Sequence, residues 1–499
     1  MTSRNRVEIG FLWNLLGGFW NVALSFIAVP YLVSILGEAR YGVYALVVVL
    51  LTYFQILDFG FSRALVRFGV ESKEALRHHL GTTLVLQFTV ALVAVAVLGG
   101  FAPQFATLLL GADAPDKASA INALRIAALS LAFTLAAGGP AAALRAQHRF
   151  GDVNLIYSAS LTLGLVSMIA AAALGFGLEG VMWALALRSA VYFTLLMVAT
   201  RRSLGPVPIR FDRTAFKSLA GFGGWVALSN GILSPLLQNY EKLVMGSLVS
   251  AEAVTYYMVP FRAVSQLRVL PSSLSSALFP HLSALDGKDD TELFRVSWRA
   301  SELLLWVLLP FFSVLWIAGH PLLALWMGED FATRSHTILL ILTIGHFLSM
   351  LTWHSISVIH AKNRPRLIVG FYLAEAAIFL PAAYFLMQRW GAEGAAVAWT
   401  GRIALDAVLM GGGAYLLARP PDSVSARWRL APLLVGTVLI AIAVAVSRDC
   451  SNYCQLAVAT VTSLALIALA WRSVLNPGEQ ARVYGMAQKL MSKVRKTQP

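Results

Sequence analysis

Residues 177–188 read GLEGVMWALALR, and residues 391–402, 214 positions further along, read GAEGAAVAWTGR. Two glycines, a glutamate, an alanine and an arginine agree at matching places. Further loops repeat at nearly the same distance, Glu38-Ala39 with Glu252-Ala253 and Leu110 to Asp113 with Met327 to Asp330. A period of this length indicates one structural unit that occurs twice.

The composition is that of a membrane protein. Hydrophobic residues occupy 58% of the 499 positions, charged residues only 13%, and the mean hydropathy is +0.71. Soluble domains carry about 25% charged residues. Apolar runs of about 18 to 25 residues recur, and each can cross a hydrocarbon core of roughly 30 Å as a helix. We therefore predict an all-α integral membrane protein with about 14 transmembrane helices, at residues 11–35, 43–62, 80–101, 121–144, 155–176, 181–199, 223–246, 254–279, 301–319, 336–359, 368–388, 395–417, 431–447 and 455–472.

The basic residues are distributed unevenly between alternate loops. With the N-terminus inside, the inner segments hold 28 of the 39 Lys and Arg residues. The outer loops hold only five, Arg40, Lys117, Arg334, Arg389 and Arg448. This asymmetry follows the positive-inside rule and predicts that both termini are cytoplasmic. Because the charge follows the membrane surface, the net charge of +14 points to membrane lipids as partners and not to nucleic acid.

The repeat and the predicted spans together define the architecture. The matching loops place six helices in each half, so both halves enter the membrane in the same direction. We predict two parallel six-helix bundles, residues 1–205 and 206–420, around a central cavity. Residues 421–499 add two helices and a basic cytoplasmic tail. Such paired bundles are typical of transporters, since rocking them exposes the cavity to alternate sides.

Short motifs in several loops carry a family resemblance. They are Leu36-Gly37 with Tyr41-Gly42, Asp58-Phe59-Gly60 with Arg63, Ala146 to Phe150 with Asn154, and Pro321 to Gly328 with Phe331. In this order and spacing they resemble the multidrug/oligosaccharidyl-lipid/polysaccharide (MOP) flippase superfamily, in its Wzx-like polysaccharide branch. The resemblance covers roughly residues 5–420.

The resemblance implies a function. A relative of these flippases in the bacterial inner membrane would move an undecaprenyl-diphosphate-linked oligosaccharide from the inner to the outer leaflet. The product would serve O-antigen, capsule or exopolysaccharide synthesis. The expected partners are the lipid-linked oligosaccharide and the polymerase and chain-length regulator of the same pathway. No cofactor and no enzymatic activity are expected.

An anionic, sugar-bearing substrate needs a polar, electropositive path through the membrane. Arg268, expected near the middle of the span 254–279, is a candidate anion-binding residue, and Arg262 is a second candidate that could instead reach the outer headgroups. Polar stripes at helical spacing also fit a cavity lining or interhelical hydrogen bonds. They supply the other candidates, Asn230, Ser234 and Gln238 in one predicted helix, Gln55 in another and Asn21 in a third.

Three acids are placed deeply enough in predicted spans to bind a coupling proton or sodium ion: Asp58, Glu375 and Asp406. Each could instead neutralise an arginine. Arg402 has Asp406 one turn later, which favours a structural role for it and for its repeat counterpart, Arg188.

The two cysteines, Cys450 and Cys454, fall in one short loop on the predicted outer side, where a disulfide or two free thiols would fit. No metal site is expected, because His346 and His360 are 14 residues apart, about 21 Å along a helix.

Three other functions share parts of this pattern. A multidrug extruder of organic cations should have an acidic cavity, but the midspan charges here are mostly basic. A lipid II flippase would be expected to carry arginines in its first helix, and none occurs between Arg6 and Arg40. A membrane polymerase or ligase needs a large outer loop, and the longest here is about 20 residues, near 101–120.

Overall fold

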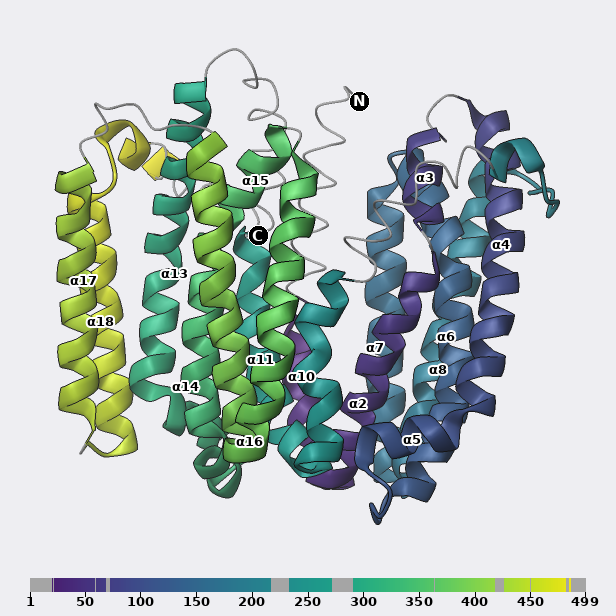
Figure 1. The fold of residues 1–499 in the computed structure, drawn as a ribbon, viewed down its shortest axis with the longest axis horizontal. Helices are drawn as coiled ribbons and strands as arrows, with labels where there is room; N and C mark the ends of the chain where they lie inside the picture. Colours follow the sequence, from purple (N-terminus) through teal and green to yellow (C-terminus); the bar gives the residue numbers. More distant parts are fainter. Residues whose placement is uncertain are drawn as a thin grey trace, which may run out of the picture. The chain divides into compact units, whose positions relative to one another are not determined.

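A computed structural model describes residues 22–58, 60–68, 72–216, 233–271, 290–362, 364–417, 426–448 and 450–481, with Trp20, Tyr484 and Gly485. These residues form helices and turns, without a strand among them (Figure 1). Nine of the helices within these ranges are long and apolar enough to cross a membrane. The chain forms two compact units, Met1–Gln266 with Val369–Arg402, and Leu267–Ile368 with Ile403–Pro499.

The first unit begins with an apolar helix, Val22–Leu36, and continues as a helical bundle. Its helix α6 packs against α4 on one side and α8 on the other, and α8 also packs against α7. Small residues at 136–143 of α6 (AAGGPAAA) permit this close packing. The elements are α2 (Glu38–Phe54), η1 (Gln55–Asp58), α3 (Phe61–Phe68), α4 (Lys73–Gly100), α5 (Ala102–Leu110), α6 (Lys117–Ala146), α7 (Phe150–Ala173) and α8 (Gly177–Leu204).

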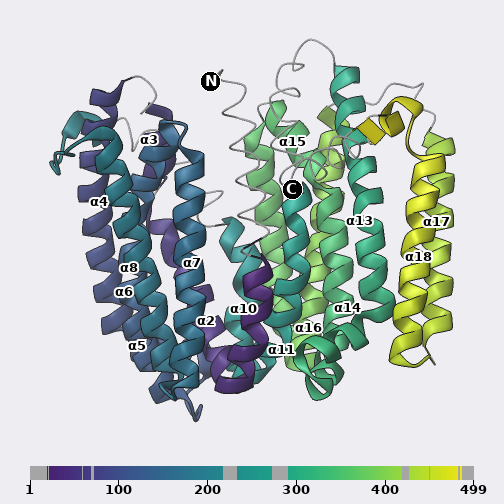
Figure 2. The same ribbon diagram turned by 180° about the vertical axis from the view of Figure 1, so that it is seen from behind.

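Helices that follow residue 205 in the sequence complete this unit. Helix α2 packs against both α10 (Ser234–Leu248) and α11 (Ala251–Ser265), as the two opposite views show (Figures 1 and 2). Two glycines bring the backbones together. A Cβ atom on Gly42 would lie 1.8 Å from the carbonyl oxygen of Ala251, and one on Gly246 would lie 2.2 Å from that of Leu109. A larger residue at either position would force these helices apart.

The second unit is built around the long helix α13 (Asp290–Met327), which packs against α14 (Glu329–Leu351) and α18 (Asn452–Ser473). Its core includes Trp306 and Leu309 of α13 with Leu466 of α18. The remaining elements are α15 (Trp353–Ala361), the end of α16 (Pro365–Leu417) and α17 (Ala426–Ser447). The expected spans 368–388 and 395–417 both lie in α16, on either side of the non-helical Gly391.

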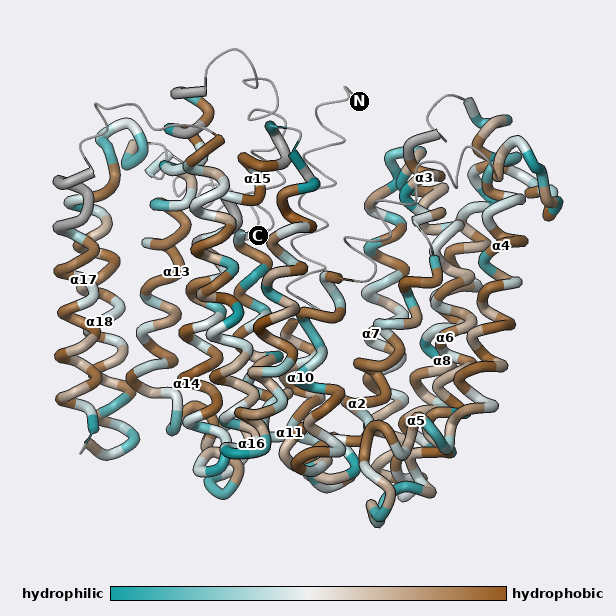
Figure 3. The backbone as a smooth tube through the Cα atoms, in the orientation of Figure 1, coloured by the Kyte–Doolittle hydropathy of each residue, from teal (hydrophilic) through white to brown (hydrophobic). Residues whose placement is uncertain are grey.

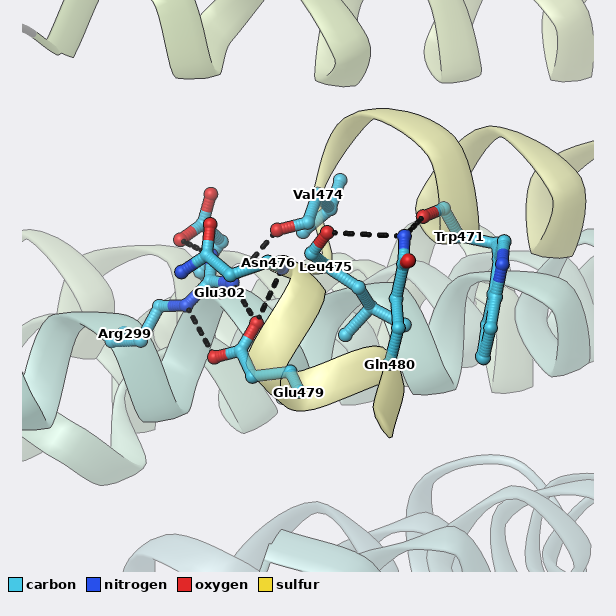
Figure 4. A network of polar contacts seen from close by, with 8 residues as sticks. All are labelled: Arg299, Glu302, Trp471, Val474, Leu475, Asn476, Glu479 and Gln480. Carbon is cyan, nitrogen blue, oxygen red and sulfur yellow. Dashed lines mark hydrogen bonds and ion pairs between the residues drawn. The ribbon is translucent and has the colours of Figure 1, made fainter. Parts of the chain in front are cut away.

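The segment after α18 is fastened to α13 by one arginine (Figure 4). Arg299 of α13 lies 2.6 Å from a carboxylate oxygen of Glu302 and 2.5 Å from one of Glu479. It also donates to the carbonyl oxygen of Val474 at 2.7 Å. Gln480 adds a bond to the carbonyl of Trp471. Residues 474–481 are thereby held at one end of α13.

Hydropathy follows the helices. Apolar residues run along them and polar residues concentrate at the turns (Figure 3). Large apolar side chains are exposed on many helices, among them Leu92, Leu174 and Leu325. Exposed leucines of this kind are expected where helices face lipid.

Three of the predicted spans contain a break in the α-helix that the sequence did not predict. The span 43–62 breaks after Phe54 into η1 and α3, with Gly60 at φ 76°. The span 254–279 leaves the α-helix at Ser265 and continues as the 3₁₀ turn η3 (Gln266–Arg268). The span 336–359 is interrupted at Thr352. The breaks at 55 and 266 lie 211 residues apart, close to the repeat distance of 214 found in the sequence. The expected outer loop near 101–120 contains α5. The prediction that the repeat divides at residues 205 and 420 stays a prediction.

Candidate functional site

A cavity of about 50 Å³ lies inside the first unit, between the helix Val22–Leu36 and helices α2, α7, α8 and α11. Apolar and polar side chains share its lining. The polar side chains are Ser25, Tyr41, Tyr44, Arg188 and Arg262. No carboxylate lines this cavity among the residues that the structure describes. The site therefore combines two fixed positive charges with hydroxyl groups and apolar side chains.

Helix α11 carries Arg262. The helix starts at Ala251, so Arg262 lies about 16 Å along it, in its last turn. Arg268, expected near the middle of the span 254–279, lies beyond the end of α11 in η3. Its depth in the membrane and its part in anion binding stay predictions.

Tyrosines of α2 surround Arg262. Its guanidinium lies close to the side chain of Tyr41, which is 2% exposed. The ring of Tyr44 lies 5.6 Å from that of Tyr41, and its hydroxyl contacts the sulfur atom of Met168 at 3.9 Å. The hydroxyl groups of these tyrosines are neutral, so they do not neutralise the positive charge of Arg262.

Arg188 reaches the same cavity from α8. Its guanidinium carbon lies 5.7 Å from the ring centre of Tyr157, a cation–π distance. Gly164 of α7 makes room for the stem of the side chain. A Cβ atom there would lie 2.6 Å from Cδ of Arg188 and 2.9 Å from both its Cβ and its Cγ. Arginine is suited to phosphate groups, since its planar guanidinium donates two parallel hydrogen bonds.

Sequence reasoning identified Arg262 but placed Arg188 among the structural residues, and it did not select Tyr41 or Tyr44 as site residues. Tyr41 belongs to a family motif, which was the available signal. For Arg188, the available signal was its position inside a predicted span. Its match to Arg402, for which the sequence favoured a structural role, led to the same interpretation of Arg188.

The other predicted binding residues lie outside this cavity. Arg268 belongs to the second unit. On α10, Gln238 donates to the hydroxyl of Ser234 at 2.7 Å, so these two polar residues bond to each other. Gln55 is exposed in η1. Asn21 and Asn230 lie outside the described residues.

Asp58 has a well-defined structural environment. Its carboxylate accepts hydrogen bonds from the Ser62 hydroxyl at 2.8 Å, the Ser62 backbone N–H at 3.3 Å and the Gln87 side chain at 2.8 Å. Gln87 in turn accepts from the backbone N–H of Gly139 at 3.0 Å. Asp58 thus caps the start of α3 and joins it to α4 and α6. Its predicted part in ion coupling stays a prediction.

Glu375 forms a buried ion pair. One of its oxygens lies 3.0 Å from a guanidinium nitrogen of Arg402, and both side chains are almost fully buried. The sequence pointed to Asp406 as the neutralising partner of Arg402, and the structure shows Glu375 in that role. Asp406 is 8% exposed. Ion coupling at Glu375 or Asp406 stays a prediction.

A second buried pair lies on α10. Glu241 and Lys242 approach to 3.4 Å and are 0% and 2% exposed. The hydroxyl of Tyr257 donates to Glu241 at 3.1 Å, and the Lys242 ammonium lies 3.9 Å from the ring centre of Phe261. This pair joins α10 to α11. Burial of Glu241 also shows that it does not continue the exposed polar face of Gln238.

Cys450 and Cys454 are joined through their sulfur atoms, with their Cα atoms 5.5 Å apart. They lie at the turn between α17 and α18. Within the described ranges, no group of three or more His, Cys, Asp or Glu residues is arranged to hold a metal ion.

Comparisons with known proteins identify relatives of this chain. Residues 31–336 match the model of a family described as "Polysaccharide biosynthesis protein". A Shigella flexneri protein named "Putative O-antigen transporter" is 27% identical over 408 residues, which cover 80% of this chain and 95% of that protein.

Solved structures share the fold at low sequence identity. The lipid II flippase MurJ in an inward closed conformation aligns with a TM-score of 0.72 at 12% identity, over 94% of this chain and all of that one. A multidrug resistance MATE family transporter of the MOP superfamily, in an inward-facing conformation, aligns with a TM-score of 0.63 at 15% identity, over 85% of this chain and all of that one. These relatives and neighbours are named as biosynthesis proteins, transporters or flippases.

Proposed function

Because this chain belongs to the family of polysaccharide biosynthesis proteins, we propose that it moves a lipid-linked oligosaccharide from the inner to the outer leaflet of the bacterial inner membrane. The substrate is an undecaprenyl-diphosphate carrier bearing the sugar unit of a surface polysaccharide. The relative named as an O-antigen transporter supports this substrate class. Both termini lie in the cytoplasm, and the polymerase and chain-length regulator of the pathway act on the product outside.

The observation that carries the proposal is the charge of the cavity. Arg262 and Arg188 line a cavity to which no described carboxylate contributes. An anion that enters such a cavity gains charge-assisted hydrogen bonds, whereas an organic cation is repelled. The cavity therefore favours a diphosphate-bearing substrate over the cationic drugs of a multidrug extruder. Lipid II, which also carries a diphosphate, remains the second candidate on the strength of the MurJ fold.

The first unit is joined tightly at the end predicted to face outward. The hydroxyl of Thr255 donates to the backbone carbonyl of Glu38 at 2.6 Å, and the Tyr256 hydroxyl donates to the Glu38 carboxylate. Backbone contact at Gly42 lies beside them. Release of substrate to the outer leaflet requires these contacts to separate. In the alternating-access cycle that we propose, they form the outer closure.

The experiment asks where the lipid-linked oligosaccharide lies in cells depleted of this protein, with a sugar-cleaving probe added only to the outer face. Depletion should cause probe-inaccessible units to accumulate. Wild type and Arg389→Gln, a matched change at an exposed arginine, should restore access. Arg262→Gln, expressed at the same level, should not.

Two results would count against the proposal. If the units reach the outer face in depleted cells, the protein is not their flippase, and drug export becomes the leading function. If Arg262→Gln restores access fully, the cavity is not the substrate path.

A further inference from the structure

Two arginines at equivalent places in the repeat have different surroundings. Arg188 and Arg402 end the matching segments 177–188 and 391–402. Arg402 is neutralised by Glu375 at 3.0 Å and is buried with it. Arg188 has no carboxylate within 4.0 Å in the part of the chain that the structure describes; the group that faces its guanidinium is the ring of Tyr157. One arginine thus completes an internal ion pair, and the other presents its charge to a cavity.

Arg188 shares that cavity with Arg262, although the two come from helices α8 and α11 in different halves of the sequence. A charge within a membrane costs several kcal/mol unless it is compensated. Here the tyrosines and Met168 offer only neutral partners. Two such charges on the lining of one cavity attract a counter-ion, and a group with two negative charges can pair with both.

We propose that Arg188 is a second anion-binding residue of the transport path, and that it acts with Arg262 to hold the diphosphate of the carrier lipid. This inference rests on the proposed function. A diphosphate fits because it offers oxygen atoms on two phosphorus centres, one for each planar guanidinium. Arg402, the repeat counterpart of Arg188, has only a structural role.

Gly164 positions Arg188. The stem of the side chain lies flat against α7 where a glycine leaves the backbone uncovered, and a methyl group there would meet three of its carbon atoms within 3 Å. Gly164→Ala therefore displaces the guanidinium without removing its charge. If Gly164→Ala weakens binding only by displacing Arg188, it should have no effect in a protein that already lacks Arg188.

The test measures lipid binding by the full-length protein in nanodiscs, using native mass spectrometry with undecaprenyl diphosphate and, as the uncharged comparison, undecaprenol. Arg188→Gln should weaken diphosphate binding about tenfold, the loss of roughly one charged hydrogen-bonding partner, and leave undecaprenol binding unchanged. Arg188→Lys keeps the positive charge but loses the planar guanidinium with its paired N–H donors. Its affinity for the diphosphate should lie between those of wild type and Arg188→Gln. The matched control, Glu375→Gln with Arg402→Gln, removes the internal pair and should bind as wild type does.

A double-mutant cycle tests the positioning. Gly164→Ala alone should weaken diphosphate binding, and in the Arg188→Gln background it should have no further effect. Thermal stability of each variant in the same nanodiscs shows whether it is folded. A sugar carboxylate is the other anion that the two arginines could bind. Octyl glucuronide is therefore added as a competitor of undecaprenyl diphosphate, to show whether the site prefers a carboxylate.

The outcomes separate this inference from the proposed function. If wild type prefers the diphosphate and folded Arg188→Gln retains that preference, the inference fails and the function stands. The inference also fails if the Glu375/Arg402 double variant loses binding to the same extent, or if the glucuronide displaces the diphosphate at equal concentration. If wild type binds both lipids equally, and depleted cells still expose their oligosaccharide, the function fails as well.

Discussion

At the scale of single residues, acidic side chains inside the protein are stabilised either by neutral hydrogen-bond donors or by an ion pair. Asp58 is surrounded by donors, and its carboxylate is held by Ser62 and Gln87. Glu375 is held by Arg402. In both cases a side chain that was a candidate for ion coupling has a partner that fixes it. Substitutions that preserve shape can therefore distinguish a structural carboxylate from one that exchanges an ion.

The first prediction concerns Asp58. Asp58→Ala removes the cap of α3 and should lower stability by about 1 to 2 kcal/mol. Asp58→Asn keeps an oxygen acceptor for Ser62 and should retain most of both stability and transport. Thermal unfolding and the outer-face probe assay measure the two effects. If Asp58→Asn is stable but abolishes transport at every pH, the carboxylate is a coupling group.

The second prediction concerns the Glu375–Arg402 pair. Removing one partner leaves a buried charge unpaired, so Glu375→Gln and Arg402→Gln alone should each destabilise the protein by roughly 3 to 5 kcal/mol. The double variant should regain most of that loss, because neither charge then remains. Thermal unfolding of all three measures the coupling between the sites. Equal stability of single and double variants would show that the pair contributes nothing.

At the scale of helices, glycines determine how closely neighbouring elements approach. Gly42 and Gly246 bring α2 and α10 against the backbones of α11 and α5. Gly164 of α7 leaves room for the side chain of Arg188, which comes from α8. Gly99 and Gly100, by contrast, have open space where a Cβ atom would lie. The same residue type thus has a packing role at some positions and none at others.

The third prediction concerns Gly42. Gly42→Leu should keep α2 and α11 apart and hold the outer end open, which stops transport. Gly99→Leu, where nothing lies within 4 Å, is the matched control. Thr255→Cys, placed at a side chain that is 0% exposed, reports the change. A membrane-impermeant maleimide should label it in the Gly42→Leu protein and scarcely in the control.

Equal labelling in the two backgrounds would contradict the outer closure. If transport is lost but labelling of Thr255→Cys does not increase, Gly42→Leu does not act by holding the outer end open.

At the scale of the whole molecule, the distribution of charge predicts an orientation. Basic residues concentrate in alternate loops, and the positive-inside rule predicts that the turn between α17 and α18 faces the outer side. Cys450 in that turn and Cys454 in the first turn of α18 are the only cysteines of the chain. They therefore offer a direct test of orientation.

The fourth prediction uses this pair. In intact cells, an impermeant maleimide should label the wild-type protein only after reduction, because the thiols are joined and face the oxidising side. The variant Cys454→Ser should be labelled at Cys450 without reduction. Labelling that requires permeabilised cells would reverse the topology. Labelling of wild type without reduction would show that the thiols are free.

Sequence by itself predicted the class of the molecule, since length, apolar runs and loop charges are local properties. It also located Arg262 as a candidate binding residue. It placed helix ends less well, because the breaks at 55–58 and 266–268 depend on capping and turn contacts that hydropathy does not register. Two of the motifs that resemble the MOP superfamily, Leu36-Gly37 and Pro321 to Gly328, lie in loops that the repeat relates.

Only the tertiary structure shows how the surroundings of Arg188 and Arg402 differ. In the sequence they occupy matching places in two similar segments, and both appeared structural. A carboxylate 27 positions away on the chain neutralises one of them, whereas the other meets a tyrosine, a glycine and a second arginine. Whether a buried charge is paired depends on which helices pack beside it, and periodicity along a single helix carries no information about that choice.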